Sequence, residues 1–226
     1  MEKSPCTTCH FISKAARVLT DVELETLESK CAQVSYRKGE VIFKQDALST
    51  NIIYIKTGLI KLHMASKNRD QIIKIVKAPA YTGIPTTFAE NINQYSATAL
   101  QDTVACFIDV NAFKTFINNN GDFAFEIIIN LCQDSLENYK RCVNRNQKKT
   151  PGRVAETLLF FAEKIFDREE FEFPLSRNDL ADLICSSRES VSRIINDFNT
   201  DGLISLEGKN IAIKNRKLLE QVAKNG

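Results

Sequence analysis

The distribution of apolar residues divides the chain into a β-rich first half and a helical second half. Between residues 33 and 109, short apolar runs rich in β-branched residues are separated by turn-forming residues. Closely spaced runs of this kind are typical of an antiparallel sandwich or barrel. The runs are Tyr36, Val41–Phe43, Ile52–Ile55, Leu59–Met64, Ile72–Val76, Ser96–Leu100 and Thr103–Ile108. Thr20–Glu23, just before Leu24 and Leu27, predicts a short capped helix ahead of them.

A long amphipathic helix is predicted from Asp122 to Asn146. Its apolar side chains recur at steps of three and four, which places them on one face of a helix. At ~1.5 Å per residue such a helix is roughly 37 Å long, more than most helices inside a small domain. We therefore expect this face to form a dimer interface, while packing on the chain's own sheet is the alternative. The face consists of Phe125, Ile128, Cys132, Leu136, Tyr139 and Val143.

The remaining residues predict a helical domain that ends in a hairpin. Asn146–Gly152 contains Pro and Gly and predicts a break and a domain boundary. Arg153–Phe166 follows with a helical apolar stripe. Ser176–Asp179 and Ser186–Glu189 have the form of capping boxes, so each predicts the start of a further helix. The last helix is expected to end at Asp201–Gly202. Two short strands, Leu203–Leu206 and Ile211–Ile213, follow as a hairpin.

The last of these helices has two chemically different faces. Val191, Ile194, Ile195 and Phe198 are spaced to point one way. Its polar face is suited to the DNA major groove, because arginine can bond guanine O6 and N7 while glutamate accepts from cytosine N4. The alternative is that these charges pair with one another four residues apart. The polar residues are Ser187, Arg188, Glu189, Ser192, Arg193 and Asn196.

These elements predict an α+β chain with three parts. Residues 1–121 form an N-terminal antiparallel β-roll (a cupin-like jelly roll) with a short leading helix. Residues 122–149 form the long dimerisation helix and a hinge. Residues 150–226 form a winged helix-turn-helix that binds double-stranded DNA, since two closely spaced helices are followed by a hairpin.

Composition and charge narrow the function. Of the 226 residues, 43% are hydrophobic and 26% charged, which is ordinary for a soluble protein. The net charge is only +2, so DNA binding depends on where the charges lie. The longest apolar run, near Phe125–Leu131, is too short to span a membrane, and no leader pattern opens the chain, so a cytoplasmic protein without a membrane partner is expected. His10 and His63 accompany no convincing nucleophile or carboxylate pair, and no Gly-rich phosphate loop is present, so an enzyme is not expected.

With these motifs in place, the sequence resembles the Crp/Fnr family of bacterial transcription regulators. S-R-x-x-L-A, S-R-E-S-V-S-R and D-G-L-I-S occur in the family's order between Leu175 and Ile213. G-E-V-I-F at Gly39–Phe43 and Y-I-K-T-G-L-I-K at Tyr54–Lys61 match its cyclic-nucleotide-binding-like β-roll. The resemblance implies a homodimer that regulates transcription, with RNA polymerase and a small-molecule effector as further partners.

The resemblance also implies an operator. Arg188, Glu189 and Arg193 match the family's base-contacting positions, with Ser192 beside them. An arginine at the first of these positions accompanies TGTGA-like half-sites in the family. We therefore expect a palindrome with TGTGA-like halves one helical turn apart, as two-fold symmetry requires.

The effector differs from that of the family's cyclic-AMP receptors. Those receptors bind the ribose with the glutamate of a G-E-L motif and the phosphate with an R-S pair. This chain has Ile84-Pro85-Thr86 and Tyr95-Ser96 at the matching positions. Ile84, Pro85, Tyr95 and Ser96 are thus the expected effector-pocket residues, but they supply no cation for a buried phosphate. The effector is expected to be a compound other than cyclic AMP.

The cysteines suggest an alternative function. The chain has seven, an odd number, which favours thiols over a disulfide framework. Oxygen-sensing members of the family hold an iron–sulfur cluster, and Cys6, Cys9 and Cys106 match three of its four ligands. The position of the remaining ligand falls near Lys14, so His10 or Cys31 would have to replace it. An iron–sulfur or redox sensor that uses Cys6, Cys9 and Cys106 is therefore the alternative.

Overall fold

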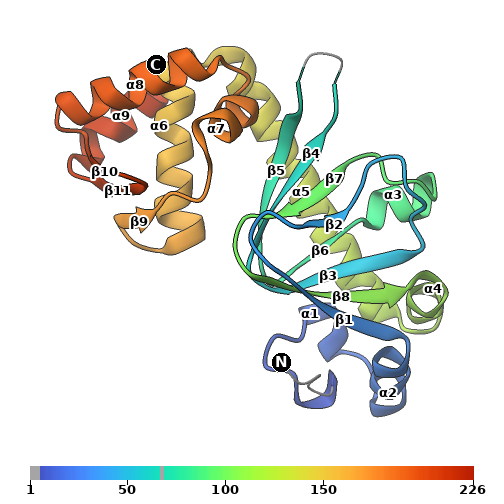
Figure 1. The fold of residues 1–226 in the computed structure, drawn as a ribbon. Helices are drawn as coiled ribbons and strands as arrows, with labels where there is room; N and C mark the ends of the chain where they lie inside the picture. Colours follow the sequence, from blue (N-terminus) through green and yellow to red (C-terminus); the bar gives the residue numbers. More distant parts are fainter. Residues whose placement is uncertain (1–5, 67–68) are drawn as a thin grey trace. The chain divides into compact units, whose positions relative to one another are not determined.

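The β-rich part of the chain folds into two four-stranded sheets in the computed structural model, which describes residues 6–66 and 69–226 (Figure 1). The pairings are antiparallel, as predicted. In spatial order, one sheet contains β1 (Cys31–Tyr36), β8 (Thr103–Asp109), β3 (Asn51–Thr57) and β6 (Ala80–Thr82). The other contains β2 (Val41–Phe43), β7 (Ser96–Ala99), β4 (Leu59–Met64) and β5 (Gln71–Lys77). The three-residue strand β6 was not predicted, because Ala80–Thr82 lacks an apolar run like that of Val41–Phe43.

Strand β3 separates two apolar cores. Ile53 and Ile55 point into the space between the sheets, where they pack with residues of β2, β4, β5, β7 and β8. Ile52 and Tyr54 point the opposite way and pack with residues of α4 and α5. Because successive side chains of a strand point to opposite faces, one strand contributes to both cores.

The second core joins the helices of the first unit to its sheet. The helices are α1 (Lys14–Arg17), α2 (Asp21–Ser29), α3 (Ile84–Ala89), α4 (Val110–Asn119) and the first part of α5 (Gly121–Gln147). Phe113 of α4 packs edge-on against Phe123 of α5, with ring centroids 5.2 Å apart. The predicted cap of α2 is confirmed, because the Glu23 amide donates to the Thr20 hydroxyl and the Thr20 amide donates to the Glu23 carboxylate.

The contacts divide the chain into two compact units, of which the second contains residues 69–72 and 137–226. Its elements are α6 (Thr150–Phe160), a π-helical turn (Phe161–Phe166), β9 (Glu170–Glu172), α7 (Arg177–Ile184), α8 (Arg188–Thr200), β10 (Ile204–Glu207), β11 (Asn210–Ile213) and α9 (Arg216–Asn225). Strand β11 lies between β10 and β9, so the predicted hairpin forms two strands of a three-stranded sheet.

The long helix is confirmed, and the break after it is shorter than predicted. Helix α5 ends at Gln147 and α6 begins at Thr150, so only Lys148 and Lys149 separate them. Pro151 lies in the first turn of α6 instead of in a linker. Proline is tolerated there because the first amides of a helix have no intrahelical partner. None of the helices in the described residues is long and apolar enough to cross a membrane.

Gly58 between β3 and β4 gives a test of the sandwich. Its φ is +103°, and an added Cβ would lie 2.7 Å from the Asp102 carbonyl oxygen. Gly39 also has a positive φ, +90°, but a Cβ added there would meet no atom within 4 Å. Gly121 has neither a positive φ nor an atom within 4 Å of an added Cβ. We expect Gly58→Ala to lower the free energy of unfolding by about 3 kcal/mol, and Gly39→Ala by about 1 kcal/mol. Gly121→Ala should be near neutral in denaturant unfolding, and equal losses for Gly58→Ala and Gly39→Ala would contradict this packing.

Candidate nucleic-acid interface

Helices α7 and α8 are joined by a sharp three-residue turn. Cys185 ends α7 in the left-handed conformation, with φ of 53°. The Ser186 amide then donates to the Ala181 carbonyl, 2.9 Å away, which ties the turn to the end of α7. Ser187 follows as the residue before α8. The predicted helix–turn–helix is therefore present, with β10 and β11 after it (Figure 1).

The two helix starts differ in how well they were predicted. The capping box at α7 is confirmed, with reciprocal bonds between Ser176 and Asp179. The predicted box from Ser186 to Glu189 is wrong, because the N-cap of α8 is Ser187, whose hydroxyl accepts from the Ser190 amide at 3.1 Å. Ser186 is unsuited to the cap, since its amide is already bonded to the end of α7.

The apolar face of α8 is fully packed. Val191, Ile194, Ile195 and Phe198 are all buried, as predicted. Helix α8 packs on α6 and α7 through this face. Burying side chains of this size contributes roughly 1.5–3 kcal/mol each, so the orientation of α8 about its own axis is set by its apolar residues.

The opposite face of α8 is exposed and charged. Arg188, Glu189, Arg193 and Asn196 are exposed, and Ser192 is half-buried beside them. Within the described residues no ion pair joins Glu189 to Arg193, so the alternative of mutual pairing is wrong for this structure. Bonds from its own amide and from Ser187 lower the pKa of Glu189. The face therefore presents an ionised acceptor between two guanidinium donors.

The predicted effector residues do not converge on one space. Ile84 is buried in the core between the sheet and the helices, and Pro85 is exposed in the first turn of α3. Tyr95 packs against the other core, and its hydroxyl accepts from the Gly83 amide at 3.3 Å. The Ser96 hydroxyl accepts from the Gln45 amide at 2.9 Å. The polar groups of Tyr95 and Ser96 are thus already bonded within the protein.

The cysteines of the alternative site lie in one region without forming a ligand set. Cys6, Cys31 and Cys106 pack against the core between the sheet and the helices. Cys106 faces Tyr54 on β3, and Cys9 lies near the same tyrosine. Within residues 6–66 and 69–226, no group of three or more His, Cys, Asp or Glu side chains is arranged to hold a metal ion. In the described residues these cysteines are therefore not arranged as the ligands of a metal ion.

The predicted dimer face of α5 is exposed along its length. Phe125 is 62% exposed, Leu136 59% and Tyr139 66%, whereas Phe123 and Ile127 are buried in the chain's own core. Ile128, Cys132 and Val143 of the same face are also exposed. The alternative, in which this face packs on the chain's own sheet, is therefore wrong.

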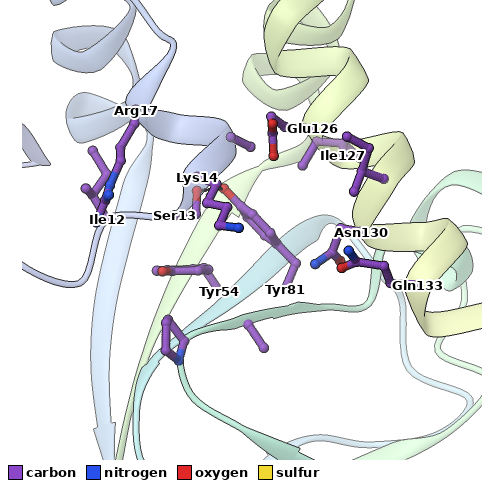
Figure 2. Close-up of a pocket in the computed structure, with 14 residues that line it drawn as sticks. Ile12, Ser13, Lys14, Arg17, Tyr54, Tyr81, Glu126, Ile127, Asn130 and Gln133 are labelled. Carbon is purple, nitrogen blue, oxygen red and sulfur yellow. Dashed lines mark hydrogen bonds between the residues drawn. The ribbon is translucent and has the colours of Figure 1, made fainter. Parts of the chain in front are cut away.

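A cavity of about 370 Å³ was missed by the sequence analysis (Figure 2). It lies in the first unit, between residues 12–17, strands β3 and β6, and the first half of α5. No local pattern identifies it, because its walls come from separate segments of the chain.

The chain is similar to known proteins over both predicted domains. Residues 33–120 match the cyclic nucleotide-binding domain, and residues 152–222 match the Crp-like helix-turn-helix domain. A CRP-like cAMP-activated global transcriptional regulator of Mycobacterium tuberculosis is 23% identical over 89% of this chain and 92% of its own length. The fumarate and nitrate reduction regulatory protein of Yersinia pestis is 23% identical over 92% of this chain and 85% of its own.

Solved structures share the fold. A protein of Eubacterium rectale assigned to the crp/fnr family of transcriptional regulators superposes with a TM-score of 0.79. It is 17% identical, and the match covers 94% of this chain and 99% of that one. FixK2 of Bradyrhizobium japonicum has a TM-score of 0.77 and 20% identity, over 85% of this chain and 96% of its own.

Proposed function

This chain belongs to the Crp/Fnr family of transcription regulators, and we propose that it binds a palindromic DNA operator as a homodimer. It is a DNA-binding transcription regulator and not an enzyme, as its domains and relatives indicate. The observation that carries the proposal is the division of α8 into a buried apolar face and an exposed charged face. The packed face fixes the orientation in which the exposed face presents its side chains to base edges.

The exposed face of α8 supplies three base contacts in this proposal. Arg193 bonds O6 and N7 of a guanine, and Glu189 accepts from the N4 amino group of a cytosine. Arg188 contacts the first bases of a TGTGA-like half-site. Ser187, Ser192 and Asn196 flank these residues and form the remaining DNA contacts. The two half-sites are one helical turn apart, about 34–36 Å, because the two recognition helices are related by a two-fold axis.

The homodimer is formed through the exposed stripe of α5. Leu136 and Tyr139 expose large apolar surfaces that water solvates poorly. A contiguous exposed apolar patch on a soluble protein is typical of an interaction surface. A second copy supplies a matching stripe, and an isologous two-fold contact buries both.

The effector is a small molecule other than cyclic AMP. A cyclic phosphate needs a cation when it is buried, and Pro85 and Tyr95 offer none. The amide of Gly83, at the start of α3, is already bonded to the Tyr95 hydroxyl. RNA polymerase is the expected protein partner, and the cytoplasm is the expected compartment.

A second candidate function is an iron–sulfur or redox sensor that uses Cys6, Cys9 and Cys106. One observation favours it, namely that Cys6, Cys31 and Cys106 pack against the same apolar core. Against it stands the lack, in the described residues, of a metal-ligand group. The regulator without a cluster is therefore the better supported proposal.

Selection of binding sites from random DNA tests the base contacts. The wild-type protein should select a palindrome, and Arg193→Ala should lose about 1–3 kcal/mol of discrimination at one base pair of each half-site. Lys217→Ala removes the same charge from an exposed position on α9 and should keep the preference. A wild-type selection without two-fold symmetry would refute the proposal, as would an unchanged preference in Arg193→Ala.

Sedimentation velocity tests the dimer. Leu136→Asp places a charge in the centre of the stripe, so we expect a monomer that no longer binds DNA. Asn138→Asp introduces the same charge on an exposed position of α5 outside the stripe and should remain a dimer. A Leu136→Asp variant that sediments as a dimer would reject this interface.

Cysteine crosslinking tests the same interface without perturbing it. Equivalent stripe residues meet across a two-fold axis at distances that a disulfide can span. Mild oxidation should therefore crosslink the wild type and Cys142→Ser but leave Cys132→Ser uncrosslinked. The opposite dependence would place a different face of α5 at the interface.

Anaerobic purification distinguishes the two candidate functions. Because the cysteines form no ligand group in the described residues, the protein should be colourless and free of iron, also after reconstitution. Brown protein that contains iron, and that loses both colour and iron in Cys106→Ala, would establish the alternative instead.

A further inference from the structure

The cavity of the first unit has an apolar side. Ile127 of α5 and Ala15 of α1 are buried side chains that border it, with Pro79 and Ala80 beside them. Tyr54 and Tyr81 add two aromatic rings whose centroids are 4.9 Å apart. A volume of about 370 Å³ lies within the range of small-molecule sites.

The segment that covers this space is fastened to the sheet. The Ser13 and Tyr81 hydroxyls are 2.7 Å apart and share a hydrogen bond. The Tyr54 hydroxyl donates to the Phe11 carbonyl. Burial raises the pKa of both tyrosines, so both remain protonated at neutral pH. The wall that carries Lys14 and Arg17 is therefore held in place over the rings.

Five further polar side chains around the cavity are not used by the described part of the protein. Neither the Lys14 nor the Arg17 side chain has a hydrogen bond or ion pair with any described residue, although the Arg17 charge lies close enough to Tyr54 to oppose the rise of its pKa. Glu126, Asn130 and Gln133 of α5 are likewise without a partner among the described residues. Figure 2 shows Lys14 extending from α1 toward the tyrosines, with Asn130 and Gln133 approaching from the side of α5.

The charges and rings around the cavity indicate the chemical class of ligand that it favours. Two cations on one wall outnumber the single carboxylate of Glu126, so the site favours an anionic group near Lys14 and Arg17. The rings and Ile127 favour a flat or apolar body. Asn130 and Glu126 accept hydrogen bonds from a donor at the other end. We propose that this cavity binds a small amphipathic organic anion, one carrying a carboxylate or a similar charge on a flat body with a hydrogen-bond donor.

Because residues of α5 line the cavity, such a ligand would contact the proposed dimer helix. Glu126, Asn130 and Gln133 lie on α5 next to the stripe of Phe125, Ile128 and Cys132. An occupant that binds one arrangement of α5 better than another shifts the population toward it. This regulatory consequence rests on the proposed function, whereas binding itself does not.

Binding is tested with anilinonaphthalene sulfonate, a fluorescent anion with a flat body, titrated into the full chain without DNA. The wild type should bind it, and Lys14→Glu/Arg17→Glu should raise the Kd about tenfold or more, because charge-assisted hydrogen bonds are lost. Lys38→Glu/Lys44→Glu carries the same change of charge on exposed residues of this unit and should keep the wild-type Kd. Asn130→Trp should also lose binding, because the larger side chain fills the space while the cations remain.

Displacement of the dye tests the ligand class. Indole carboxylate should displace it, and indole carboxamide, a neutral analogue of similar shape, should do so about tenfold less effectively. Equal displacement by the two compounds, or loss of dye binding in both double variants alike, would overturn the proposal. Because no DNA is present, a failure here leaves the DNA-binding proposal intact, and failure of the operator selection leaves the cavity intact.

Discussion

The division of α5 into two faces is the constraint on which the rest of the structure depends. Phe123 and Ile127 anchor the helix in the core of the first unit, and this fixes which residues remain outside. The exposed stripe follows as a geometric consequence, since residues three and four apart repeat on one face. In the proposed homodimer, a helix anchored on one side and exposed on the other would couple the effector-binding unit to the second subunit.

Helix α8 follows the same principle on a smaller scale. Its four buried residues fix its orientation about the helix axis, so its charged residues lie on the opposite, exposed face. The exposed Arg188, Glu189 and Arg193 form no ion pairs with one another in the described residues, so their side chains can form hydrogen bonds with a ligand. Function at this site thus depends on packing, because a recognition helix free to rotate would present no defined pattern of donors and acceptors.

Features encoded by local periodicity were predictable, and features that depend on distant contacts were not. The long helix, the faces of α8 and the capping box at Ser176 follow from residues within one or two turns of each other. Strands β6 and β9 were not predicted because neither contains an apolar run. Each is three residues long and is defined by its pairing with a strand elsewhere in the chain. The N-cap of α8 shifted by one residue because Ser186 is bonded to the end of α7. The cavity was not predicted because four separate segments form it.

Footprinting of the wild-type protein on its selected operator tests the central claim most directly, because it reports dimer symmetry and base recognition together. The account predicts two protected half-sites on the same side of the DNA, with centres about 34–36 Å apart. It also predicts that both are protected over the same range of protein concentration. Protection of a single half-site, or of two half-sites at clearly different protein concentrations, would contradict it.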